Sequence, residues 1–89
     1  MTDAQLYTTI LDVLLQSGDW ITFDELERAL PWDATDEKRF SELRRARLRG
    51  AVARAIYADH IERTKTGQAK YRIKQDFAEM VDLFSGAET

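Results

Sequence analysis

The hydrophobic period of this sequence changes once, at Asp59–His60, and that change restricts the fold more than any other feature. Before it, apolar residues recur every three or four positions, as on one face of a helix. After it, "HIERT" and "AKYRI" alternate apolar and polar residues on either side of a Thr66–Gly67 turn. A chain of 89 residues forms one small domain. We therefore expect a single, mainly α-helical domain over residues 1–89, with a small antiparallel β-hairpin.

The first helix is expected over residues 3–17. Its apolar residues follow helical spacing and make a face wider than one packing seam needs. Thr2 or Asp3 can cap its start, and Gly18 is well placed to end it. The segment "DWIT" that follows is too short for an independent strand, so we interpret it as a third strand added to the hairpin.

The second helix is expected to begin after Thr22. Glu25 follows Thr22 by three residues, which is the spacing of a capping box. The helix runs through "FDELERAL" with Leu26 and Leu30 directed inward, and Pro31 ends it.

Two interpretations are open for residues 36–58. Gly50 costs about 1 kcal/mol inside a helix, and the apolar phase shifts at that point. We favour two helices with a break near Gly50, the first directing Phe40, Leu43 and Ala46 inward and the second covering about residues 50–58. One continuous bent helix is the alternative.

Positive charge is concentrated in one third of the chain. Residues 1–43 hold ten acids and three bases, a net charge of -7. Residues 44–74 hold ten bases and two acids, or +8, and residues 75–89 hold four acids, or -4. A charge that changes sign along a short chain becomes a patchy surface after folding. Two interpretations are open: the cations pair with acids on neighbouring helices, or they form a basic surface for an anionic partner, which the order of the elements favours.

Several classes of function lack their sequence signatures. The chain has no cysteine, which excludes thiolate metal sites and thiol nucleophiles, and no apolar run long enough to span a membrane. No signal peptide is recognisable at the start, so a cytoplasmic location is expected. The chain contains one histidine, His60, which we interpret as a helix-ending residue at positive φ rather than a metal ligand. No nucleotide-binding motif or catalytic constellation is present, so we expect neither enzyme activity nor a cofactor.

The order of these elements resembles that of winged helix-turn-helix domains of small bacterial or phage regulators. The resemblance covers roughly residues 4–73 and is carried by "ITFDELERAL", "AVARAIYADHI" and the hairpin "IERTKTGQAKYRI". In many such regulators a leucine, three residues, a glycine and then a leucine or isoleucine lead into the wing. Ile56, His60 and Ile61 match that pattern, with His60 in the glycine position.

The resemblance implies sequence-specific binding of double-stranded DNA, as in a transcription regulator or a phage DNA-transaction factor. One helix would enter the major groove, and the hairpin would serve as a wing against the backbone or minor groove. Arginine reads guanine bidentately, whereas lysine mostly meets phosphate as a point charge. The predicted DNA-binding residues are Arg44, Arg45, Arg47, Arg49, Arg54, Arg63, Lys65, Lys70 and Arg72.

A further helix is expected over about residues 75–85. The first and last helices carry more apolar surface than a winged helix needs, so we expect them to pair in a homodimer that presents two recognition helices to a palindromic site. The predicted dimer interface consists of Leu11, Leu15, Phe77, Met80, Val81 and Phe84.

A second hypothesis comes from another class of function. Winged helices also serve as protein–protein adaptors or inhibitors, and the acidic face formed by residues 1–43 could engage a basic partner or mimic DNA.

Overall fold

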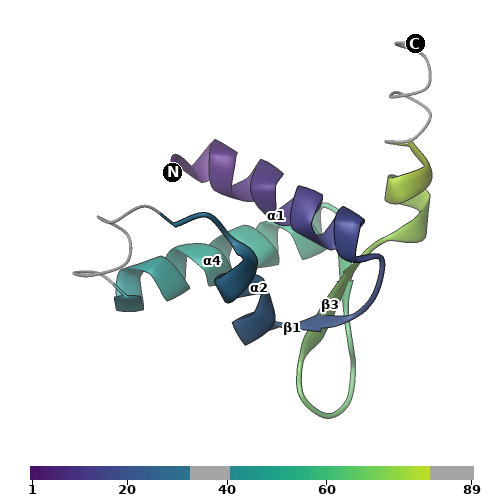
Figure 1. Ribbon diagram of the computed structural model, residues 1–89. Coiled ribbons are helices and arrows are strands. Elements are labelled where there is room, and N and C mark those ends of the chain that lie inside the picture. Colours follow the sequence, from purple (N-terminus) through teal and green to yellow (C-terminus); the bar gives the residue numbers. More distant parts are fainter. Residues whose placement is uncertain (33–40, 81–89) are drawn as a thin grey trace.

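The computed structural model describes residues 1–32 and 41–80, and it is mainly helical with one small antiparallel sheet (Figure 1). Residues 75–80 are also helical, and they begin the C-terminal helix expected from the sequence. The named elements in chain order are α1 (Asp3–Ser17), β1 (Ile21–Thr22), α2 (Phe23–Ala29), α4 (Ser41–Tyr57), β2 (Ile61–Arg63) and β3 (Lys70–Ile73).

The helix ends follow the signals in the sequence. The Thr2 side chain accepts a hydrogen bond from the Gln5 backbone, and the Gln5 side chain accepts one from the Thr2 backbone, which makes a capping box at the start of α1. Thr22 and Glu25 form the same reciprocal pair at the start of α2, as predicted. Gly18 ends α1 at φ 66°, a left-handed conformation that glycine adopts without steric cost.

The sheet confirms that residues near "DWIT" add a third strand. Its strand order is β1-β3-β2, and both pairings are antiparallel. Ile21 lies opposite Tyr71, and Ile61 lies opposite Ile73. Tyr71, Ile73 and Ile61 are buried as predicted, because alternate residues of a strand point to the same face.

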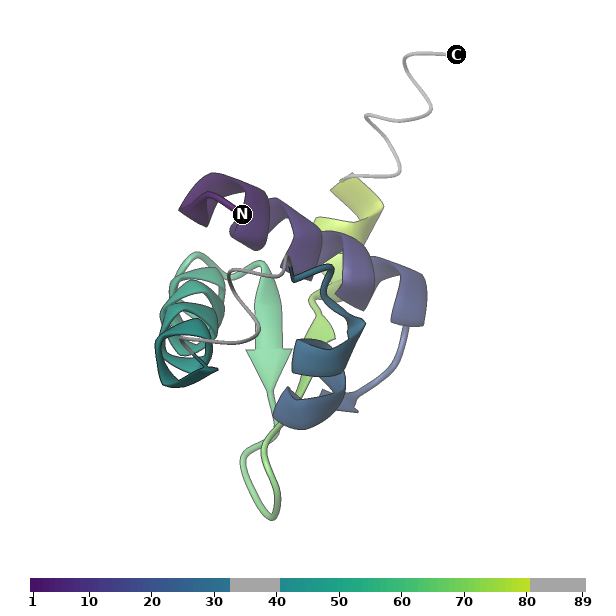
Figure 2. The same cartoon turned by 60° about the vertical axis from the view of Figure 1, so that its left-hand side comes forward.

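The core lies between α1, α2, α4 and the inner face of the sheet. Leu6, Ile10 and Leu14 of α1 are at most 1% exposed, and α1 contacts both α4 and β3. The loop end of the hairpin extends beyond this body in both views (Figure 2). The other buried apolar residues are Leu26, Leu30, Leu48, Ala51, Val52, Ala55, Ile61, Tyr71 and Ile73. The hairpin and one side of α4 are thereby left at the surface.

The predicted break near Gly50 is wrong, and the alternative of one continuous helix is correct. α4 runs from Ser41 to Tyr57 through Gly50, which has no positive φ. Leu48, Ala51, Val52 and Ala55 form one uninterrupted buried face, and burying them offsets the cost of about 1 kcal/mol for a helical glycine. Only part of the expected 36–48 helix lies within the described residues, and the prediction for Phe40 falls outside them.

Two further expectations near α4 are wrong. Leu43 and Ala46 are exposed rather than directed inward, because the buried face of the continuous helix passes through Leu48. The residue at positive φ after α4 is Asp59, at 69°, and not His60. His60 instead donates its backbone N–H to the carbonyl oxygen of Ala55.

Candidate nucleic-acid interface

Helix α4 carries two apolar faces on opposite sides. One is the buried face through Leu48. The other, which we call the outer face of α4, contains Leu43, Ala46, Gly50, Ala53 and Tyr57, spaced by three and four residues in turn. Leu43 is 56% exposed and Tyr57 is 94% exposed, so this face is covered by none of the described elements. The spacing is visible in the sequence, but the predicted helix phase directed two of these residues, Leu43 and Ala46, toward the core.

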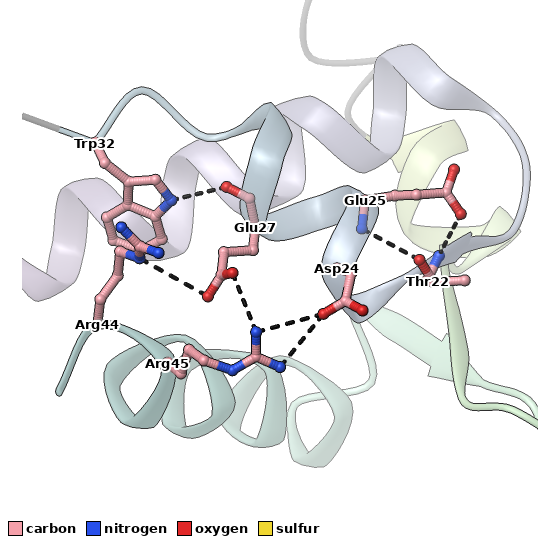
Figure 3. A network of polar contacts seen from close by, with 7 residues as sticks. All are labelled: Thr22, Asp24, Glu25, Glu27, Trp32, Arg44 and Arg45. Carbon is pink, nitrogen blue, oxygen red and sulfur yellow. Dashed lines mark hydrogen bonds and ion pairs between the residues drawn. The ribbon is translucent and has the colours of Figure 1, made fainter. Parts of the chain in front are cut away.

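The first two predicted DNA-binding arginines point toward α2 (Figure 3). Arg45 Nη1 donates to Glu27 Oε1 at 3.1 Å, and Arg45 Nη2 donates to Asp24 Oδ1 at 3.3 Å. Arg44 Nε lies 3.8 Å from Glu27 Oε2, and the Arg44 guanidinium lies 5.5 Å from the centre of the Trp32 ring. The Glu27 side chain is only 12% exposed, so its charge is compensated mainly by these two arginines.

Arg47 and Arg72 are also paired with carboxylates. Arg47 Nη2 donates to Asp3 Oδ1 at 3.1 Å and to the Met1 carbonyl oxygen at 2.6 Å, which joins α4 to the start of α1. Arg72 donates to Glu62 across the hairpin and lies 4.4 Å from the centre of the Trp20 ring. Four of the nine predicted DNA-binding residues, Arg44, Arg45, Arg47 and Arg72, are thus engaged within the domain.

The other five predicted DNA-binding residues have exposed side chains, and the described part of the chain offers them no ion pair: Arg49, Arg54, Arg63, Lys65 and Lys70. Arg49 and Arg63 come together at a groove of about 220 Å³ between α4 and the hairpin, lined also by Phe23, Val52, Ala53, Ile56 and Tyr71. Arg63 is brought there by its register, because it pairs with Tyr71 on the inner side of the sheet.

The three remaining cations without an ion pair in the described residues lie elsewhere on the surface. Lys65 lies in the loop of the hairpin and lines a second hollow together with Arg63. Lys70 lies near the start of α2, where it contributes to lowering the pKa of Glu25 below its ordinary value, although the main cause is the hydrogen bond from the Thr22 backbone. Arg54 lies near Tyr7 of α1, whose pKa is raised by burial and lowered in part by this arginine.

The His60 side chain packs against two aromatic residues of its own domain, Tyr7 and Phe77. Its Nδ1 is 2.8 Å from the hydroxyl oxygen of Tyr7, and its ring stacks on Phe77 with 4.2 Å between ring centres. Beside it, Lys74 forms an ion pair of 2.9 Å with Asp59, and this hydrogen bond and charge lower the pKa of Asp59 and raise that of Lys74. Residues 1–32 and 41–80 contain no cluster of three metal-ligating side chains.

The predicted dimer residues are only partly available. Leu11, Leu15 and Phe77 are partly buried against the core of their own chain, whereas Met80 is 47% exposed. Val81 and Phe84 lie outside the described residues. Met80 is therefore the clearest described candidate for a contact with a second chain.

Comparison with protein-family models, curated proteins and solved structures found no match for this chain. Across the described ranges, none of the helices combines the length and apolarity that crossing a membrane requires.

Proposed function

We propose that this domain binds double-stranded DNA in the manner of a winged helix-turn-helix protein, through α4 and the β2–β3 hairpin. The observation that carries the proposal is that Arg49 of α4 and Arg63 of the hairpin, neither of them ion-paired within the described residues, line one groove between these two elements. Half or more of the contacts in protein–DNA complexes go to phosphate and sugar, and a pair of free guanidinium groups suits that role.

The order of elements supports the same proposal. A helix, a short strand, a capped helix, the long helix α4 and a hairpin follow one another, and the short strand completes a three-stranded sheet with the hairpin. In this arrangement the recognition helix would be α4. Its outer face and the hairpin loop are both exposed, so a duplex could reach them without any rearrangement of the described residues.

The ion pairs within the domain lower the number of cations that are available to contact phosphates. Nine cations are candidates from the sequence, but Arg44, Arg45, Arg47 and Arg72 already compensate carboxylates. If three or four of the five free cations meet phosphates, log affinity should fall against log salt with a slope of about -3 to -4. We therefore expect weaker and less salt-sensitive binding than the sequence alone suggests.

The neighbours Arg47 and Arg49 provide a matched test. We expect Arg49→Gln to weaken binding to a duplex and to make the salt slope less negative by about one, since one phosphate contact is lost. Arg47→Gln changes the same charge two residues away, but Arg47 is bound to Asp3, so its slope should match the wild type. Fluorescence anisotropy with a labelled duplex at two salt concentrations measures both. No binding at low salt, or equal losses in the two variants, would overturn the proposal.

We also propose that the protein forms a two-fold dimer, which can be tested separately from DNA binding. Met80 is exposed and lies within the acidic segment of residues 75–89, so Met80→Glu should lower the molar mass measured by light scattering if this surface pairs. Glu79→Lys is a control that alters charge next to the same site. A wild-type protein that is monomeric throughout the concentration range of the binding assay would contradict the dimer and leave DNA binding as a single-domain event.

The structure offers less support to a protein adaptor that uses its acidic face. Asp3, Asp24 and Glu27 belong to that face, and each is bound to an arginine of α4. Their charge is therefore largely compensated before any basic partner arrives.

A further inference from the structure

We propose that α4 reads DNA mainly through thymine methyl groups rather than through guanine, so that the preferred sites are rich in A·T pairs. This inference rests on the proposed function and concerns which bases the helix contacts. It follows from the chemistry of the outer face of α4, which consists of Leu43, Ala46, Gly50, Ala53 and Tyr57.

The outer face has few hydrogen-bonding groups that could read a base edge. Of the four arginines in "RRARLR", Arg44, Arg45 and Arg47 are bound to Asp3, Asp24 or Glu27. Bidentate recognition of guanine requires a free guanidinium group in the groove. Arg49, the fourth, lines the groove beside the hairpin, and its guanidinium lies 5.9 Å from the centre of the Phe23 ring. Arg54 has no ion pair within the described residues either, and its Nη1 atom reaches the outer face, 3.7 Å from the Cβ position of Gly50.

The centre of the outer face allows a close approach. Ala46, Gly50 and Ala53 occupy it, and a Cβ added at Gly50 would meet only the Arg54 Nη1 atom, at 3.7 Å. No neighbouring atom within the domain therefore requires a glycine at position 50, although glycine disfavours the helix. We attribute Gly50 to a binding partner that approaches the outer face of α4 closely and requires a flat surface there.

A duplex fits both the shape and the charge of this face. The major groove admits an α-helix, and the thymine methyl group in it is recognised by apolar contact with residues such as alanine. Arg49 and Arg63 lie along one side of the apolar stripe, and Arg54 extends from its other side with Nη1 close to Gly50, so that phosphates on both sides of the groove would meet cations. An apolar stripe between cations thus complements methyl groups between two rows of phosphates.

The substitution of uracil for thymine isolates the methyl group. We expect the wild-type protein to bind an alternating A·T duplex more tightly than the same duplex containing deoxyuridine, by about fourfold for each methyl group that it buries. An alternating G·C duplex of equal length should bind most weakly. Equal affinity for the A·T and A·U duplexes, or preference for G·C, would overturn the inference while leaving DNA binding intact; failure to bind any duplex at low salt would instead overturn the proposed function.

Gly50→Ala tests whether the outer face is the surface involved. The substitution should raise the melting temperature, because alanine favours the helix and has room in the domain. It should also weaken binding to the A·T duplex and reduce the ratio between the A·T and A·U affinities, because the added methyl group holds the helix away from the bases. A variant that is more stable and binds both duplexes as the wild type does would contradict the inference, and would indicate that this face meets a different partner.

Discussion

Replacing Glu27 by glutamine should destabilise the domain, because it leaves two arginines without their shared carboxylate. Glu27 accepts a charge-assisted hydrogen bond of 3.1 Å from Arg45 and lies 3.8 Å from Arg44. Its side chain is 12% exposed and that of Arg44 is 18% exposed, so water can replace little of the lost interaction.

The expected loss of unfolding free energy lies between the values typical of buried and of surface ion pairs. Hydrogen bonds to charged groups contribute about 1.5–3 kcal/mol, whereas exposed ion pairs contribute about 0–1 kcal/mol. Arg45 is 37% exposed, which lowers its share. We expect Glu27→Gln to reduce the free energy of unfolding by about 1.5 kcal/mol, equivalent to roughly 6–12 °C in Tm for a domain of this size.

Urea unfolding followed by circular dichroism measures the loss. Asp12→Asn is the matched control: it removes one negative charge from an exposed position of α1 and should change stability by less than about 0.5 kcal/mol. A double-mutant cycle with Arg45→Gln should give a coupling energy of at least about 0.5 kcal/mol. Equal stability of Glu27→Gln and Asp12→Asn, with no coupling, would show that the network contributes nothing and would refute the reasoning.

Three more predictions concern the caps and the core. Thr22→Ala should cost about 1 kcal/mol of stability and Thr22→Ser much less, since serine keeps the hydroxyl that accepts from Glu25; chemical denaturation compares them. The hydrogen bond from the Thr22 backbone lowers the pKa of Glu25 below its ordinary 4.5, so this stabilisation is fully present above pH 4.5 and is lost as pH falls through the lowered pKa. Urea midpoints at neutral and acid pH should therefore differ less for Glu25→Gln than for the wild type. An unchanged difference would be evidence against a stabilising role of the Glu25 carboxylate. Ile61→Ala should lower the unfolding free energy by about 2–5 kcal/mol, because Ile61 is 1% exposed; a loss below 1 kcal/mol in a thermal melt would contradict its place in the core.

Much of the fold could be predicted from the sequence because its signals are local. The cap at Thr2, the capping box at Thr22 and the left-handed Gly18 depend on residues within one turn of each other. The hairpin follows from the alternation around Thr66–Gly67. Gly50 misled the prediction, because helix propensity is a weak preference that a continuous buried face overrides.

The candidate site was less predictable. Arg44, Arg45, Arg47 and Arg49 are near neighbours in the sequence and have the same chemistry, yet only Arg49 is left without a carboxylate in the described residues. Their partners Asp3, Asp24 and Glu27 lie at least seventeen positions away along the chain. Which arginine meets which acid depends on how α1 and α2 pack on α4, and no local pattern records that packing.

By itself, the sequence determined where most helices begin and end, which strand residues are buried, and how much charge the chain carries. These properties arise from neighbouring residues and from the period of the chain. Only the tertiary structure decided which charges are available to a partner and which side of α4 faces water. An ion pair forms only where two side chains from distant segments come within about 4 Å, and that proximity is produced by packing of the core.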